Sequence, residues 1–374
     1  MKRVLSLVLA IVLTVSMFAA CGTSTPAATT AAPTTAAPAP AGKPYIAVIS
    51  KGFQHQFWQT VAAGSKDAAA KYDVDYTFEG PPSESDISIQ VDMVNAALAK
   101  NPKALALAAL DTQSLNSQLE QAKNSGIPVI GFDSGVPEAP AGSVLSTAST
   151  NNYEAGRLGA QEMMKEAGFA AKLKAATAAA PVSIAVESQD ATSASILDRT
   201  NGFIDEFVKL AEGVHPGAVE VVGHDVFKKD AASAAVSVKV TVPPSTSSTD
   251  MQAAAQAMLQ NTQNLIGFFC SNEAAVGGVL AATTDGTDLD RASGKYKDLI
   301  VIGFDAGSTQ KVAVKNQYFY GSITQDPYMI GFLAVELAVK AINGESLDTI
   351  VDTGCKFYTY ANMDQPDIAQ LLYD

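Results

Sequence analysis

Cysteine, tryptophan, histidine and basic residues are all scarce in this chain of 374 residues. It contains three cysteines, three histidines and one tryptophan, and its 25 lysines and arginines stand against 38 aspartates and glutamates, which gives a net charge of −13. So few cysteines exclude a disulfide framework. Nucleic acid requires clustered lysine and arginine, and we therefore expect no nucleic-acid partner.

Signatures of catalysis and metal binding are also missing from the sequence. It has no G-x-S-x-G, no P-loop, no G-x-G-x-x-G and no H-E-x-x-H motif. His55, His215 and His224 lack the spacing of zinc ligands. The acidic stretch 285–290 does not follow the EF-hand order and is interpreted as a polar turn. We expect no catalytic residue, no metal and no cofactor.

Long apolar runs are absent beyond the first residues of the chain. A basic start at Met1–Arg3 precedes an apolar run over 4–18 and the small residues Ala19 and Ala20, which predicts a signal peptide over 1–20. Cys21 follows as in a bacterial lipobox, with Phe18 where Leu is usual, and we expect Cys21 to be acylated. The alternative is an ordinary signal peptide with a chance cysteine.

The stretch 22–43 is built from Thr, Ala, Pro, Gly and Ser with one terminal Lys, and has no aromatic or large aliphatic residue. Such a composition buries too little apolar surface to offset its ordering entropy. Together with Cys21 it predicts a lipid-anchored disordered linker over 21–43, which would hold an extracytoplasmic body near a membrane.

The remainder, from residue 44 onward, alternates short apolar runs with Ala-rich amphipathic stretches. The pattern predicts strands over 46–50, 74–79, 104–110, 127–132, 182–187, 219–224, 265–270, 299–304 and 320–324, and helices over 56–71, 86–99, 112–124, 152–168, 194–210, 250–261, 273–284 and 326–342. Near-continuous apolar strands alternating with helices indicate parallel sheets covered on both faces. One compact sheet usually has fewer strands than the sequence predicts. We therefore predict an α/β fold of two doubly wound lobes.

Cys270 and Cys355 each have an apolar, strand-like sequence around them. They could pair, since an extracytoplasmic location permits disulfides. Their apolar surroundings favour the alternative of free thiols that behave as small apolar residues.

Polar clusters follow several of the predicted strands, at Asp111, Asp133, 187–190, 271–273 and Asp305. Each alone is explained as a helix N-cap, for which Asp, Ser and Asn are preferred. Together they place polar groups at the carboxyl ends of parallel strands, where open α/β sheets bind ligands. Phe57 and Trp58 follow the first strand in the same way, either as core residues or as part of a site.

Seven strings in order resemble the ribose-type solute-binding proteins of the periplasmic-binding-protein-like I class, the substrate-binding lipoproteins of sugar ABC transporters. They are FW (57–58) with VAAG (61–64), ALD (109–111), GIPVIGFD (126–133), DRTNGF (198–203), FCSNE (269–273), VIGFD (301–305) and GSITQDPYMIG (321–331). The resemblance implies two lobes joined by a three-strand hinge, with a ligand cleft between them. By analogy the N-terminal lobe takes 44–133 and 326–356, and the C-terminal lobe takes 134–325 and 357–374.

The resemblance also implies the ligand-binding residues. Flat aromatic rings cover the apolar faces of a sugar, and planar polar groups match its neighbouring hydroxyls. The matching positions are His55, Phe57, Trp58, Asp111, Arg199, Asn272, Asp305 and Gln325. Three departures put ribose itself in doubt: His55 replaces Asn, Thr112 replaces Arg, and no aromatic stands near Asp250.

These features predict a monomeric, lipid-anchored, extracytoplasmic protein that captures a sugar-like ligand and delivers it to an ABC transporter permease. A sensory receptor for a signalling partner is an alternative, because it needs the same cleft and the same closure. A carbohydrate-acting enzyme is a further alternative, with Asp111 and Asp305 as the carboxylate pair to test.

Overall fold

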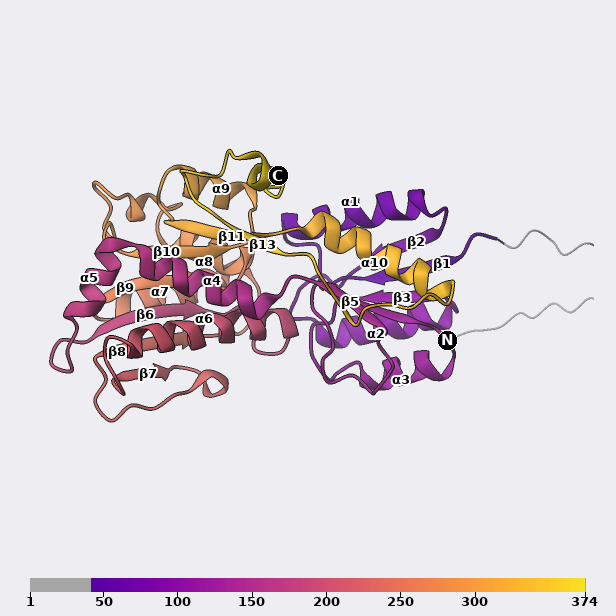
Figure 1. The fold of residues 1–374 in the computed structure, drawn as a ribbon, viewed down its shortest axis with the longest axis horizontal. Helices are drawn as coiled ribbons and strands as arrows, with labels where there is room; N and C mark the ends of the chain where they lie inside the picture. The colour runs from indigo at the N-terminus through magenta and orange to yellow at the C-terminus, as the bar shows by residue number, and fades with distance from the viewer. Residues whose placement is uncertain (1–41, 374) are drawn as a thin grey trace, which may run out of the picture. The chain divides into compact units, whose positions relative to one another are not determined.

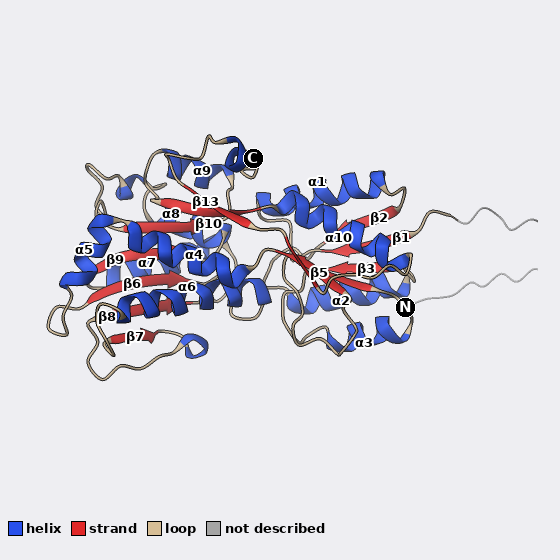
Figure 2. Ribbon diagram, viewed as in Figure 1, coloured by secondary structure: helices blue, strands red, loops and turns tan. Residues whose placement is uncertain are grey.

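The computed structural model describes residues 42–373, which form two sheets covered by helices (Figures 1 and 2). The predicted signal peptide, Cys21 and most of the predicted linker lie outside the described residues. No helix in the described part of the chain is long and apolar enough to span a membrane.

The first sheet has six parallel strands in the order β2-β1-β3-β4-β5-β12. They are β1 (Tyr45–Ile49), β2 (Asp75–Glu79), β3 (Ala104–Leu107), β4 (Val129–Phe132), β5 (Ser146–Ser149) and β12 (Ile350–Asp352). Alternate residues of β1 join two different cores. Helices α1 (Gln56–Lys71) and α10 (Pro327–Ile342) therefore cover one face, and α2 (Ile87–Ala99) and α3 (Asn116–Asn124) cover the other.

The second sheet has seven strands in the order β7-β8-β6-β9-β10-β11-β13, and only the β11–β13 pair is antiparallel. They are β6 (Val182–Glu187), β7 (Val219–Val222), β8 (Val236–Thr241), β9 (Leu265–Cys270), β10 (Ile300–Phe304), β11 (Gly321–Gln325) and β13 (Cys355–Tyr358). One face packs against α4 (Asn152–Lys165), α5 (Ala167–Ala175) and α6 (Ala194–Glu212). The other packs against α7 (Ser248–Asn261), α8 (Glu273–Ala282) and α9 (Ser308–Lys315).

Short elements complete this second lobe: the 3-10 turns η1 (Asp225–Phe227) and η2 (Thr287–Leu289) and the C-terminal helix α11 (Pro366–Ala369). Three segments connect the two sheets, after β5, after β11 and between β12 and β13. The predicted fold class, two doubly wound lobes with three connections, is confirmed.

The sheet pairing differs from the predicted lobe boundaries at two points. β5 pairs with β4 and extends the first sheet to residue 149, whereas the analogy ended this segment at 133. β13 begins at Cys355 and pairs with β11 of the second sheet, one strand after β12 of the first. β5 consists of Ser, Thr and Ala, so no apolar run marks it in the sequence.

Helices α1 and α10 cross at glycines in the first lobe. A Cβ added to Gly64 would lie 2.0 Å from the carbonyl oxygen of Tyr328, and one added to Gly331 would lie 1.9 Å from that of Val61. Beside the crossing, the Tyr328 hydroxyl donates to Asp67 at 2.9 Å. This close packing fixes α1, which carries Phe57 and Trp58.

Helices α4 and α6 repeat the same crossing in the second lobe. A Cβ on Gly202 would lie 2.0 Å from the carbonyl oxygen of Tyr153, and one on Gly156 would lie 2.1 Å from that of Arg199. The Tyr153 hydroxyl donates to Asp205 at 2.9 Å. The residue spacings are identical to those of the first lobe, so each lobe holds one helix of the predicted site in the same manner.

Glu187, at the end of β6, is a buried carboxylate without a counter-charge in the described structure. Its side chain is fully buried, and neither of its oxygens has a hydrogen-bond partner among the described residues. Burial raises the pKa of Glu187 well above its usual range. The neighbouring Cys270 is a buried free thiol and Cys355 is a half-buried one, as the sequence favoured.

The raised pKa of Glu187 predicts a pH-dependent stability. The folded state favours the protonated form of Glu187. The raised pKa therefore contributes to the free energy of unfolding fully in acid, and this contribution is lost as pH rises through the raised pKa. Glu187→Met should increase the free energy of unfolding by about 1–3 kcal/mol at neutral pH, with a smaller gain in acid. Urea unfolding at both pH values measures this, with the half-buried Glu220→Gln on β7 as control. A loss of stability at neutral pH would contradict the prediction.

Candidate functional site

The carboxyl ends of strands from both sheets meet around one small cavity of about 20 Å³. Its lining combines charged, amide and aromatic side chains from the two lobes: Lys51, His55, Phe57, Trp58, Glu84, Asp133, Ile196, Arg199, Asn272, Asp305 and Gln325. A cavity of this size holds about one water molecule. The two lobes are therefore closed upon each other at the site.

Seven of the eight predicted ligand-binding residues line this cavity, and Asp111 does not. The Asp111 carboxylate accepts hydrogen bonds from the backbone N–H of Gln113 and of Ser114, at 2.9 and 2.7 Å, and from the Ser114 hydroxyl. It thus closes the turn that leads into α3. In this structure Asp111 therefore acts as a local cap, the alternative explanation for it, and its part in ligand binding stays a prediction.

Lys51, Glu84 and Asp133 line the cavity although they were not among the predicted site residues. Asp133 follows β4 and carried a usable signal, because it ends the string GIPVIGFD at a carboxyl strand end. Lys51 directly follows the first strand. Glu84 lies in the loop after β2 and has no sequence signal beyond that position.

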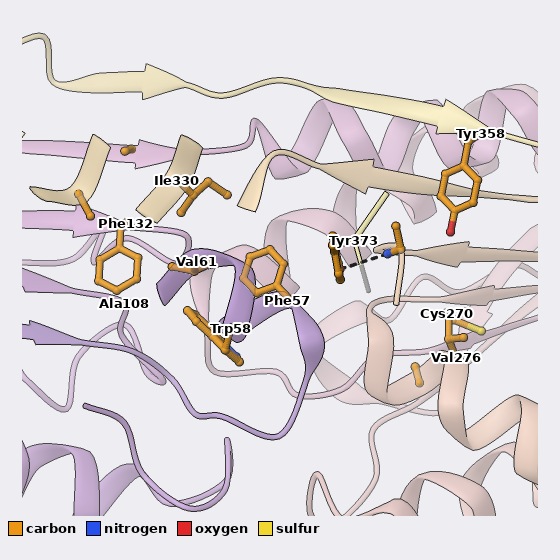
Figure 3. Close-up of a cluster of buried hydrophobic side chains, with 14 of the residues drawn as sticks. Phe57, Trp58, Val61, Ala108, Phe132, Cys270, Val276, Ile330, Tyr358 and Tyr373 are labelled. Carbon is orange, nitrogen blue, oxygen red and sulfur yellow. Dashed lines mark hydrogen bonds between the residues drawn. The ribbon is translucent and has the colours of Figure 1, made fainter. Parts of the chain in front are cut away.

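Phe57 and Trp58 are both core and site residues. Trp58 is 1% exposed, and its ring lies edge-on to Phe57 with centroids 5.0 Å apart. Figure 3 shows the Phe57 ring between Trp58 and Tyr373. The Trp58 indole N–H donates to Glu84 Oε1 at 2.8 Å. Both rings are therefore core residues that also line the cavity, and their contact with a ligand stays a prediction.

Lys51 brings a positive charge into the interior between two carboxylates. Its Nζ lies 3.2 Å from Asp133 Oδ2 and 3.8 Å from Glu84 Oε2, and it donates to Ser195 Oγ of the other lobe at 3.1 Å. Burial opposes the charge on Lys51, but attraction to Asp133 and Glu84 outweighs it and raises the pKa of Lys51.

The two carboxylates respond to burial differently. Burial acts against the charge of Glu84, yet Lys51, His55 and hydrogen bonds from Trp58 and Gln189 together lower its pKa. Burial raises the pKa of Asp133 by more than Lys51 lowers it. The network therefore holds its negative charge most firmly on Glu84.

Arg199 is held rigidly on α6. Its guanidinium donates to the carbonyl of Ser271 at 2.9 Å and to Asn152 Oδ1 at 2.7 and 3.2 Å. It also lies 3.6 Å from the ring centroid of Phe304. Burial lowers the pKa of Arg199, although the nearby carboxylate of Asp305 acts in the opposite direction. A pre-positioned guanidinium of this kind suits paired oxygen acceptors.

Asp133 and Asp305 occupy matching positions in the two lobes. Each follows the tripeptide Ile-Gly-Phe at the end of a central strand, and each has a left-handed backbone with φ of 55° and 80°. Such conformations are uncommon outside glycine and cluster at functional sites. Asp305 accepts from Gln325 Nε2 at 2.7 Å and from the backbone N–H of Glu273 at 3.0 Å.

Three cavity-lining atoms lack hydrogen-bond partners among the described residues: His55 Nε2, Asp133 Oδ2 and Gln325 Oε1. All three belong to buried or nearly buried side chains, and Asp133 Oδ2 is in an ion pair with Lys51. Since buried polar groups are almost always paired, such atoms mark where a ligand or water would bond.

The chain is similar to known binding proteins in sequence and in fold. Residues 46–346 match the model of the periplasmic binding protein domain. The D-allose-binding periplasmic protein of Escherichia coli is 23% identical over 79% of this chain and 83% of its own length.

Two solved structures cover nearly the whole body. One is titled an ABC transporter, LacI family transcriptional regulator from Brachyspira murdochii; it is 37% identical, with a TM-score of 0.72, over 89% of this chain and 99% of its own. The other is an ABC transporter solute binding protein from Agrobacterium vitis with bound D-fucose, which is 25% identical, with a TM-score of 0.72, over 88% and 100%.

Removal of the buried charge of Lys51 tests the network. Lys51→Met removes from Asp133 and Glu84 the cation that lies between them and should lower the free energy of unfolding by about 3–5 kcal/mol at neutral pH. The loss should shrink in acid, where the two carboxylates take up protons. Denaturant unfolding at both pH values measures it, with Lys100→Met, at an exposed pair 3.9 Å from Glu79, as control. Equal losses of unfolding free energy in the two variants would contradict the predicted role of Lys51 as the counter-charge of Asp133 and Glu84.

Proposed function

The chain belongs to the periplasmic binding protein domain family, and on this premise we propose that it captures a sugar or similar polyol between its two lobes and delivers it to an ABC transporter. The observation that carries the proposal is the convergence of strand-end side chains from both sheets on one cavity.

The chemistry of the lining matches a neutral polyol. Carboxylate, amide and guanidinium groups bind neighbouring hydroxyls in pairs, and the aromatic rings cover the apolar face of a sugar ring. Two cations, Lys51 and Arg199, face three carboxylates, Glu84, Asp133 and Asp305. An anionic guest would add to the excess of negative charge, so sugar acids and sugar phosphates are poor candidates.

Binding requires that the lobes move. The closed cavity of about 20 Å³ is far smaller than a typical ligand pocket of roughly 300 Å³ or more. We infer that the lobes open about the three connections, admit the ligand and close with Lys51 or its neighbours displaced. The ligand then shifts the population by its differential affinity for the closed form.

The cellular setting is part of the proposal. Lipid attachment at Cys21, with the stretch 22–43 as a tether, would keep the binding body next to the permease in the membrane. The family is that of periplasmic binding protein domains, and the D-allose-binding protein and the D-fucose-bound protein named above are binding or transport proteins. We infer from this that the protein acts as a carrier and not as an enzyme.

The position of Asp111 also argues against the enzyme alternative. Asp111 and Asp305 were the carboxylates to test for glycoside hydrolysis, but Asp111 is committed to its own turn outside the cavity. Sensing remains compatible with the same closure, and a signalling partner would replace the permease as the recipient of the closed form.

A thermal-shift screen tests the proposed ligand class. D-allose, D-ribose, D-fucose and other neutral pentoses and hexoses should be compared with D-glucuronate. A ligand at one hundred times its Kd adds about 2.7 kcal/mol to the stability of the folded state, which raises the melting temperature measurably. At least one neutral sugar should produce this rise and D-glucuronate should not. A screen without any stabilising sugar would count against the proposal.

Because Asp133 lines the cavity and Asp111 does not, we expect different effects of substitutions at these two aspartates. Asp133→Asn preserves the shape and the left-handed backbone, which Asn tolerates, but removes the charge facing the ligand. It should weaken binding of the sugar found in the screen by about tenfold to a hundredfold. Asp111→Asn, the matched control outside the cavity, should leave Kd unchanged. Titration calorimetry measures both, and the reverse result would restore Asp111 to the site.

A further inference from the structure

A second set of contacts joins the two lobes beside the ligand cavity. It consists of Gln56, at the start of α1 in the first lobe, and of Glu273 and Ser308, at the starts of α8 and α9 in the second lobe. None of these three residues lines the cavity. We refer to them together as the clasp.

Glu273 caps a helix of the opposite lobe. Its Oε1 accepts from the backbone N–H of Gln56 at 3.3 Å, and its Oε2 accepts from that of Phe57 at 3.4 Å. Helix α1 has no cap of its own, because the His55 side chain makes no capping hydrogen bond and the first turn has no acidic residue. The carboxylate that satisfies these N–H groups therefore comes from the other lobe.

Gln56 of the first lobe in turn caps helix α9 of the second lobe. Its Oε1 accepts from the backbone N–H of Ser308 at 2.7 Å and from the Ser308 hydroxyl at 3.0 Å. The N-cap of α9 is Gly307, which has no side chain with which to cap. Each lobe thus supplies a cap that the other lacks.

Gly307 provides the space in which the clasp forms. A Cβ at this position would lie 2.7 Å from Glu273 Oε1 and 3.1 Å from Gln56 Oε1. The φ of Gly307 is −59°, so its backbone suits any residue and only the space demands glycine. The position is a natural place for a wedge that blocks the clasp without touching the ligand cavity.

We propose that the clasp is a closure device: its hydrogen bonds form only when the lobes close, and their free energy sets the closed fraction and hence the affinity for every ligand of the site. The proposal rests on the opening and closing inferred above. A cap is worth roughly 2-fold to 30-fold in an equilibrium constant. Apparent affinity scales with the fraction of competent protein, so residues outside the cavity tune binding uniformly.

The single tryptophan offers a readout that needs no ligand. Trp58 is buried at the cavity and is the only tryptophan of the chain. Opening should expose it, so acrylamide quenching of its fluorescence reports the open fraction. X-ray scattering of the same full-length protein gives a second measure, because an open form has a larger radius of gyration.

The wedge variant Gly307→Ala and the clasp variant Glu273→Gln should both increase Trp58 quenching and the radius of gyration over the wild type. The matched control is Gly277→Ala on α8, where an added Cβ meets no atom within 4 Å. It should behave as the wild type in both measurements. Thermal unfolding checks that the variants are folded, and Glu273→Gln, which adds no bulk, carries the test if Gly307→Ala does not fold.

Unchanged quenching and radius of gyration in both clasp variants would overturn the proposal. Titration with D-allose separates it from the proposed function. Weaker D-allose binding by Gly307→Ala than by Gly277→Ala supports the clasp. A wild-type protein that binds neither D-allose nor the other sugars of the screen counts against the proposed function alone, since the ligand-free measurements still decide the clasp.

Discussion

The burial of Lys51 is the constraint on which the arrangement of the site depends. Its ammonium group is buried between Asp133 and Glu84 of its own lobe and bonds Ser195 of the other. Burying a charge without partners costs several kcal/mol of folding free energy, which is more than the net stabilisation from one hydrogen bond. The two carboxylates must therefore stay close, and Glu84 in turn holds the indole of Trp58.

The two lobes position their site residues by the same structural features. Each presents an aspartate in a left-handed conformation after Ile-Gly-Phe, Asp133 in the first lobe and Asp305 in the second. Each also fixes its site-bearing helix by a glycine crossing with a Tyr–Asp hydrogen bond beside it. In the proposed opening and closing, lobes of this kind would move as rigid bodies, and the change on binding would be confined to the connections and to contacts across the cleft.

The sequence predicted the layered fold because most strands appear as apolar runs and most helices as amphipathic ones. It missed β8, whose Ser237 and Lys239 interrupt the apolar run, and the short strands β5, β12 and β13, which are three or four residues long and carry no clear apolar run. Seven of the eight residues predicted for the site line the cavity, and their role in ligand binding stays a prediction. The sequence does not distinguish Asp111 from Asp133, because both follow apolar strands, and only the fold shows that one caps a turn and the other faces the cavity.

By itself, the sequence determined the periodicity of the elements, the rim at which polar groups collect and the acidic character of the chain. These properties are local, because they depend on a residue and its near neighbours. Only the tertiary structure decided that Lys51 enters the cavity, that Glu84 supports Trp58 and that Glu273 caps a helix of the other lobe. Such contacts join residues from separate loops, and their distances follow from strand order and lobe closure, which no local pattern encodes.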